Sequence, residues 1–207
     1  MERRSETWSI RTPPANTTGA WYVGGILGNA STIGANLAIT GAVSSGGVAG
    51  SAYVGGLIGY LNSTGTVTIA RSAVMGNLQV TGGSSGGFIG YAGGSVSVTD
   101  SYNLGNVTTG ATLPQVGGMF GAFFGTGTNL YTTAQLSGGP YSATNRGFKG
   151  SGAGACTNCF CTDTTIGICN GATLVNSTQI NQQATFTGWD FVSTWSINEG
   201  VSSPALR

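Results

Sequence analysis

The four cysteines are the residues whose type and spacing could most directly do chemistry. They lie close together, as C-T-N-C-F-C at 156–161 and then Cys169. Four thiolates could hold a structural zinc ion, but zinc ribbons supply them as two CxxC pairs, and only Cys156 and Cys159 have that spacing. Two disulfides in an oxidising compartment explain the cluster better, with three pairings left open among Cys156, Cys159, Cys161 and Cys169. We therefore expect no metal site and a disulfide-stapled loop or cap.

Acid–base chemistry has few candidates in this chain. The 207 residues include seven basic and six acidic side chains and no histidine, the usual proton carrier near neutral pH. An enzyme would need Asp100, Asp163, Asp190 or Glu199 to pair in space, and their spacing gives no reason to expect this. The net charge of +1, without a basic cluster, also lacks the surface that nucleic acids require. The sequence predicts no catalytic residue, no cofactor and no nucleic-acid partner.

Five asparagines stand in N-x-S/T triplets: Asn16, Asn29, Asn62, Asn106 and Asn176. In an exported protein these are possible N-glycosylation sites, although a chain so rich in Asn, Ser and Thr forms several such triplets by chance. Glycans would help to disperse a surface that carries little charge. A glycoprotein is therefore one expectation.

A 31-residue sequence repeat dominates the chain and must determine where these residues lie. A Gly-Gly-apolar-apolar-Gly motif begins at Gly24, Gly55, Gly86 and Gly117, so the interval is 31 residues three times over. Alternating, β-branched stretches follow at 66–70 and 95–99, with looser counterparts at 36–40 and 128–132. Such short strands cannot bury an apolar face unless neighbouring repeats stack on them. The predicted fold class is all-β, a β-solenoid (β-helix) of about four 31-residue repeats.

The motif glycines and the apolar pairs between them each allow two interpretations. Glycine either supplies positive φ at the corners of a coil or lets adjacent backbones approach closely. The paired apolar residues, such as Leu57 with Ile58, would point to opposite sides of an extended strand. Either one of each pair needs cover from elsewhere, or both lie in the core around a glycine bend.

The repeats resemble the GLUG family, whose pattern couples a G-L-V-G element to an N-S-Y-A-T-G-x-V element. The third repeat carries D-S-Y-N-L-G-N-V at 100–107 and the second keeps R-S-A-V-M-G-N at 71–77, while the first and fourth keep mainly the glycine half. The ending, with W-D-F at 189–191 and P-A-L at 204–206, is similar to a segment that often closes GLUG arrays. This resemblance covers about residues 20–136 and 185–207. It implies a bacterial-type cell-surface or secreted β-helical region, as in adhesins, and no catalytic residues.

We divide the chain into an N-terminal arm or cap (1–19), the solenoid (20–147), a cysteine-containing insertion (148–184) and a closing segment (185–207). Large aromatics outside the repeats could cover the apolar ends of the stack. The charged arm at 1–13 is either disordered or docks on a neighbouring subunit, in which case its removal would abolish fibres. The possible subunit contacts are Trp8, Ile10, Trp21, Trp189 and Trp195.

Two functions are consistent with these features. The first is a non-enzymatic structural subunit of an extracellular or cell-surface filament, a homopolymer formed by head-to-tail β-contacts at the open strand edges. The alternative is an adhesin module that binds glycans or other surface ligands through turns lined by Tyr and Asn. The sequence contains no apolar run without glycine that is long enough to span a membrane, so we predict no transmembrane segment. No signal peptide is visible, so we expect either a removed secretion signal or a segment of a longer protein.

Overall fold

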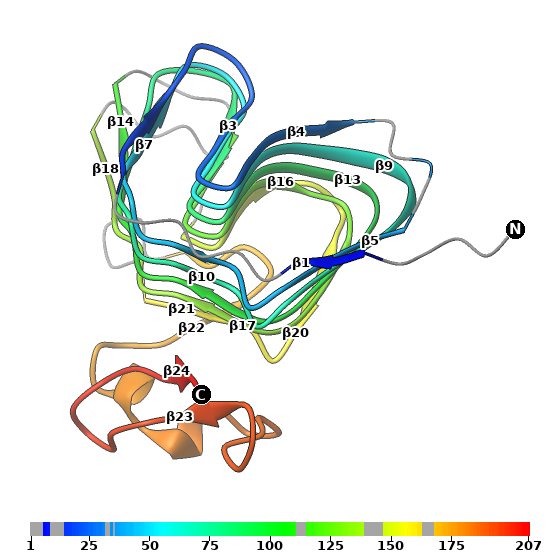
Figure 1. Cartoon of the computed structure of the whole chain (residues 1–207). Helices are drawn as coiled ribbons and strands as arrows, with labels where there is room; N and C mark the ends of the chain where they lie inside the picture. Colours follow the sequence, from blue (N-terminus) through cyan, green and yellow to red (C-terminus); the bar gives the residue numbers. More distant parts are fainter. Residues whose placement is uncertain are drawn as a thin grey trace, which may run out of the picture.

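The strands wind into a β-solenoid of about four turns, and the strands of successive coils pair in parallel (Figure 1). This computed structural model describes residues 6–8, 15–31, 34, 36–110, 115–138, 147–162 and 168–207, and of residues 6–8 only the backbone. The predicted all-β solenoid is therefore confirmed.

Three parallel sheets run along the stack. One contains β2 (Thr17–Thr18), β7 (Val48–Gly50), β11 (Leu78–Val80), β14 (Val107–Thr109) and β18 (Leu136–Gly138). The second contains β3 (Val23–Gly24), β8 (Val54–Gly55), β12 (Ser84–Gly86) and β15 (Gln115–Gly117). The largest contains β1 (Glu6–Trp8), β4 (Leu27–Ser31), β5 (Leu37–Thr40), β6 (Val43–Ser44), β9 (Ile58–Ala70), β10 (Ala73–Val74), β13 (Ile89–Asn103), β16 (Phe120–Phe123), β17 (Thr126–Thr132), β19 (Lys149–Ser151), β20 (Ala155–Thr157), β21 (Phe160–Cys161) and β22 (Thr173–Leu174).

From β1 to β21, the interval between paired residues varies between 29 and 31 within the largest sheet. On one side of a register shift between β9 and β13, Gly94 pairs with Ser63 at an interval of 31 residues, and on the other side Val96 pairs with Val67 at an interval of 29, so the extra residues lie in β9. The stretch at 36–40 does pair with 66–70, as the sequence predicts. The stretch at 128–132 instead pairs with 99–103, so its predicted alignment with 95–99 was wrong. A bulge shortens the repeat without disturbing the glycine interval.

Each coil folds inward at its glycine motif, which makes a notch between β3 and β4 and divides the cross-section into two lobes (Figure 1). A Cβ built on Gly55 would lie 1.9 Å from the Ile58 carbonyl oxygen, and one built on Gly59 would lie 2.6 Å from the Val23 nitrogen. The two walls of the notch therefore touch backbone to backbone. The motif glycines, all within the described residues, have ordinary φ angles. Close approach is thus the reason for them.

The notch separates two apolar cores. In the larger lobe both members of the apolar pairs are buried, as Leu57, Ile58, Phe88 and Ile89 show, because the bend turns both into the same core. The second interpretation of these pairs is therefore correct. The smaller lobe is filled almost entirely by valine and leucine, namely Val23, Val48, Val54, Leu78, Val80, Val107, Val116 and Leu136.

The buried side-chain amide of Asn103 in β13 binds the glycine motif at the tip of the notch. The side chain of Asn103 is fully buried, and its Nδ2 donates to the Gly118 carbonyl over 2.7 Å. Its Oδ1 accepts from the Gly105 nitrogen over 2.9 Å. The Thr132 hydroxyl also donates to Gly118 over 3.3 Å. These bonds satisfy polar groups that would otherwise be costly to bury between the lobes.

The cysteine region continues the stack where the sequence predicts an insertion. Strands β19, β20 and β21 pair with β16 and β17 and so add a further partial coil. The predicted disulfides are present, as Cys156–Cys159 and Cys161–Cys169. The second bridge ties the returning chain onto this last coil, where Cys169 and Ala172 pack against the larger core. The boundary predicted at residue 148 therefore falls inside the solenoid.

The closing segment packs on the side of the stack, beside β17, β21 and β22 (Figure 1). It contains η1 (Gln179–Asn181), η2 (Gln183–Thr185) and the antiparallel pair β23 (Trp195–Ser196) and β24 (Ala205–Leu206). Trp189 and Trp195 are 7% and 0% exposed and form a cluster with Tyr102 and Tyr131. They cover a flank and not an end of the stack, and their burial removes them from the possible subunit contacts.

The other predicted contacts lie elsewhere. Trp21 is 69% exposed. The backbone of Trp8 lies in β1, which pairs with β5 of its own chain, while Ile10 falls outside the described residues. The backbone of residues 6–8 thus pairs with its own stack, whereas the sequence left open whether the arm is disordered or docks on a neighbour.

The notch can be tested with one added methyl group. In Gly86→Ala the new Cβ would lie 2.3 Å from the Ile89 carbonyl oxygen and 2.4 Å from the Gly121 nitrogen. We expect a loss of about 3 kcal/mol in the free energy of unfolding, or a melting temperature roughly 10 °C lower. Gly34→Ala is the control, because a Cβ there meets nothing within 4 Å. Equal melting of the two variants would contradict the assigned role.

The side packing of the closing segment can be tested with two tryptophans. Trp195→Ala should destabilise the protein by about 3–5 kcal/mol, because it empties a fully buried site. Trp21→Ala removes an exposed ring and should change the unfolding midpoint little. Urea unfolding of both variants measures the contrast, and similar midpoints would show that Trp195 is not part of a core.

Candidate functional site

The carboxylates predicted as catalytic candidates hold structure. Asp100 sits at a corner of the coil with φ of 46°, in a column with Arg71, Asn129 and Asn158, which have φ of 49°, 54° and 53°. Asp and Asn tolerate this left-handed conformation better than most residues. Asn129 Nδ2 donates to Asp100 Oδ1 over 3.0 Å, and Trp195 Nε1 donates to the same oxygen over 3.3 Å. The corner column therefore anchors the closing segment.

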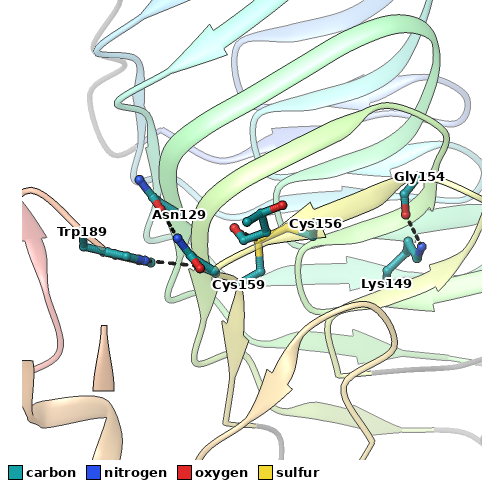
Figure 2. The surroundings of a disulfide bond; sticks show 8 residues. Asn129, Lys149, Gly154, Cys156, Cys159 and Trp189 are labelled. Atoms are coloured by element: carbon teal, nitrogen blue, oxygen red, sulfur yellow. Dashed lines mark hydrogen bonds between the residues drawn. A yellow bond between two sulfur atoms is a disulfide. The ribbon is translucent and has the colours of Figure 1, made fainter. Parts of the chain in front are cut away.

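The same column continues to the last coil. Asn158 Nδ2 donates to Asn129 Oδ1 over 3.4 Å, and Trp189 Nε1 donates to the Asn158 carbonyl over 3.2 Å (Figure 2). The Cys156–Cys159 disulfide spans this corner. Two tryptophan N–H groups thus bind two positions of the corner column, Asp100 and Asn158, with Asn129 between them.

The other two described carboxylates, Asp190 and Glu199, accept hydrogen bonds in different places. Asp190 accepts from the backbone nitrogens of Val192 and Ser193 over 2.9 and 3.0 Å and also from the Ser193 hydroxyl. The hydrogen bonds from Ser193 lower the pKa of Asp190 from 3.8 to about 2. Glu199 accepts from the Gln183 nitrogen over 2.9 Å, and Asp163 lies outside the described residues. The three described carboxylates bind different partners, and among described residues no group of three or more Cys, Asp and Glu could hold a metal.

Lys149 is the one buried charged side chain in the described part of the chain. It is 6% exposed, and its Nζ donates to the Gly154 carbonyl over 2.7 Å (Figure 2). Burial lowers the pKa of this ammonium. Its contact is with the backbone of its own coil, so it stabilises the last turn and forms no cleft.

All five sequon asparagines are exposed, which keeps glycosylation a prediction for each. Some also support the backbone. Asn16 Oδ1 accepts from the Gly47 nitrogen over 3.0 Å, and Asn106 Oδ1 accepts from the Gln135 nitrogen over 2.9 Å. Asn176 Oδ1 accepts from the Gln179 nitrogen over 2.8 Å. These bonds use the amide oxygen, whereas glycosylation takes place on the nitrogen.

An aromatic strip at the mouth of the notch was not predicted as a site. Tyr22 stacks on Tyr53 and Tyr60 stacks on Tyr91, with ring centroids 5.4 and 4.9 Å apart. Phe124 extends the row, 5.8 Å from Tyr91. The strip consists of Tyr22, Tyr53, Tyr60, Tyr91 and Phe124, and the exposed Trp21 precedes Tyr22 in the chain. The 31-residue spacing of the tyrosines indicates the two stacks, but Trp21 and Phe124 lack repeat partners and gave no signal.

The strip is open to solvent at both ends. Trp21, Phe124 and Tyr22 are 69%, 50% and 40% exposed. Burial, with smaller contributions from Tyr60 and Tyr53, raises the pKa of the Tyr91 hydroxyl, which therefore stays neutral at physiological pH. Beside Phe124 lies an open hollow of about 360 Å³. Its lining is Thr66, Gly94, Ser95, Val96, Ser97, Phe124, Gly125 and Thr126.

The two ends of the stack form a second candidate surface. At the first end β2 and β3 are the outermost described strands of their sheets, and at the other end β18 and β15 are. In the largest sheet β1 covers the edge of β5, and β22 covers that of β21. In the largest sheet the ends are thus covered, and in the other two sheets no described strand lies outside β2, β3, β15 or β18.

Comparison of the chain with protein-family models, with curated proteins and with solved structures finds no match. The resemblance to GLUG repeats therefore stays a prediction. Within the described ranges, no helix is long and apolar enough to cross a membrane.

The Asp190 turn generates a pH prediction. Because its pKa is lower in the folded chain, ionised Asp190 stabilises the turn above about pH 4, and this contribution is lost as pH falls towards about 2. An NMR titration should place the Asp190 midpoint near 2. Ser193→Ala should raise the midpoint towards 3.8, since it removes the largest cause of the shift. An unchanged midpoint in that variant would contradict the assignment.

Proposed function

We propose that this protein is a non-enzymatic structural subunit of an extracellular or cell-surface filament, assembled head to tail through its strand edges. The observation that carries this proposal is that, among the described residues, β2 and β3 are the outermost strands at one end of their sheets and β18 and β15 are the outermost at the other. Strands in these sheets run parallel throughout, so an edge at one end offers the direction that the other end needs. Such an interface is heterologous and can propagate without closing.

The absence of charged side chains from the described strands of the first coil supports the same proposal. The described residues of the first coil, 15–31, 34 and 36–40, include no charged side chain. Edges that avoid pairing usually carry charges or proline on the strand. No charge on β2 or β3 opposes a second copy, and the backbone N–H of Thr18 points to the outward side of β2.

The disulfides support the location. Two bridges in a chain of this size are typical of proteins that fold in an oxidising compartment. They tie the last coil together, which keeps the second end in the shape that a neighbouring copy would meet.

The N-terminal strand has a different role from the one expected of a docking arm. β1 pairs with β5 from Leu37 to Ile39 and so covers one open edge of the first coil. Elongation therefore requires β1 to leave this edge or to lie beside a neighbour that pairs with β2 and β3. We interpret β1 as a guard that slows assembly.

Assembly can be tested by blocking one N–H group. Thr17 and Gly19 donate to Gly47 and Ala49 in the next coil, so the N–H of Thr18 points away from the stack. Thr18→Pro removes this outward donor and should abolish fibres in negative-stain images while it leaves the circular dichroism spectrum unchanged. Thr18→Ala is the matched control and should form fibres.

Removal of residues 1–13 tests the guard. The shortened chain should form fibres faster than the full chain, because the edge of β5 becomes open. Loss of fibres on removal would instead support an arm that docks on a neighbour. Dispersed particles from both chains, at every concentration tested, would contradict the filament.

A further inference from the structure

The aromatic strip exposes more ring surface than a neutral solenoid needs for stability. Phe124 in the strip and Trp21 next to Tyr22 each leave at least half of their surface in water. The neighbouring Phe123 is fully buried, so the fold has a core position for one phenylalanine and places the next one outside. Exposed rings aligned in a row indicate a surface that binds something.

The hollow beside Phe124 supplies polar groups next to this ring. Thr66, Ser95 and Thr126 are exposed around it, and Ser97 is half-buried. Within the described part of the chain, none of these four side-chain hydroxyls has a hydrogen-bond partner. Free hydroxyls that surround one aromatic face can both donate and accept hydrogen bonds.

Charge restricts the ligand. Between Thr12 and Asn145 only Arg71 and Asp100 are charged, and both lie in the corner column at the far ends of β9 and β13 from the tyrosines. A site without charge has no counterion for an acidic or basic ligand. The ligand that fits is neutral, with apolar faces and many hydroxyl groups.

From these observations we propose that the aromatic strip and the adjoining hollow bind a neutral polysaccharide. Sugar rings would lie with their C–H faces against Phe124 and the exposed rings of the strip, while their hydroxyls bind Thr66, Ser95, Ser97 and Thr126. An apolar protein surface fits less well, because it would bury these four hydroxyls without partners. The strip crosses several coils, from Tyr22 to Phe124, and so suits an extended chain better than a single sugar.

The test measures depletion of the full-length protein by insoluble neutral polysaccharides, namely cellulose, chitin, mannan and a β-1,3-glucan, and by an acidic one, calcium alginate. We expect binding to at least one neutral polymer and none to alginate. Phe124→Ala and Trp21→Ala should each weaken the dissociation constant roughly tenfold, as expected for an aromatic anchor. Val192→Ala is the control, because this side chain is 89% exposed on the closing segment, away from the strip.

The outcomes separate this site from other uses of the strip. Failure to bind any neutral polymer, by a chain whose circular dichroism shows it folded, would overturn the proposal. So would binding that neither aromatic variant weakens, or binding to alginate alone. Concentration-dependent dimers that Phe124→Ala abolishes would show that a second copy covers the strip instead. Because Thr18→Pro monomers carry the same strip, they should bind as the full-length chain does, whether or not filaments form.

Discussion

Direct backbone contact across the notch is the constraint on which the rest of the structure depends. Only glycine permits it, because a Cβ on Gly55 or Gly59 would lie within 3 Å of backbone atoms of the facing wall. The contact divides each coil into two lobes, turns both residues of each apolar pair into one core, and leaves a tip that Asn103 binds from the opposite wall. It also brings Tyr22 and Tyr60 together from the two sides of the mouth, with ring centroids 5.1 Å apart.

The scarcity of charge becomes informative once the coils are placed in space. Asp100 binds Asn129 and Trp195, Lys149 binds Gly154, and Asp190 caps its own turn. Each of these charged groups binds a partner within its own chain, and residues 15–31, 34 and 36–40 of the first coil carry no charge. Two neutral surfaces result. One consists of the strand edges at the ends of the stack, and the other consists of the aromatic rings at the mouth of the notch. A surface without charge resists neither self-association nor a neutral ligand.

The sequence predicts the solenoid because a glycine pattern at a constant interval reports the coil directly. It also predicts the disulfides, but not their pairing, which depends on the path of the chain across the last coil. The alignment of residues 128–132 failed because the interval to β13 changes from 31 residues at Phe123 to 29 at Thr126, and alternation alone cannot show where the interval changes. Trp189 and Trp195 were misplaced because their partners, Tyr102 and Tyr131, are distant in the chain. The aromatic strip was missed because Phe124 and the adjacent Trp21 have no counterparts in the other repeats.

Hydrogen exchange of the amides at the open edges tests the central claim, that these edges join copies of the chain, most directly. In dispersed protein the outward N–H of Thr18 should exchange rapidly, whereas those of Thr17 and Gly19, which are bonded within the stack, should be protected. In assembled protein the account predicts that Thr18 becomes as protected as its two neighbours. Rapid exchange at Thr18 in the assembled state would contradict it, because the edge would then still face water.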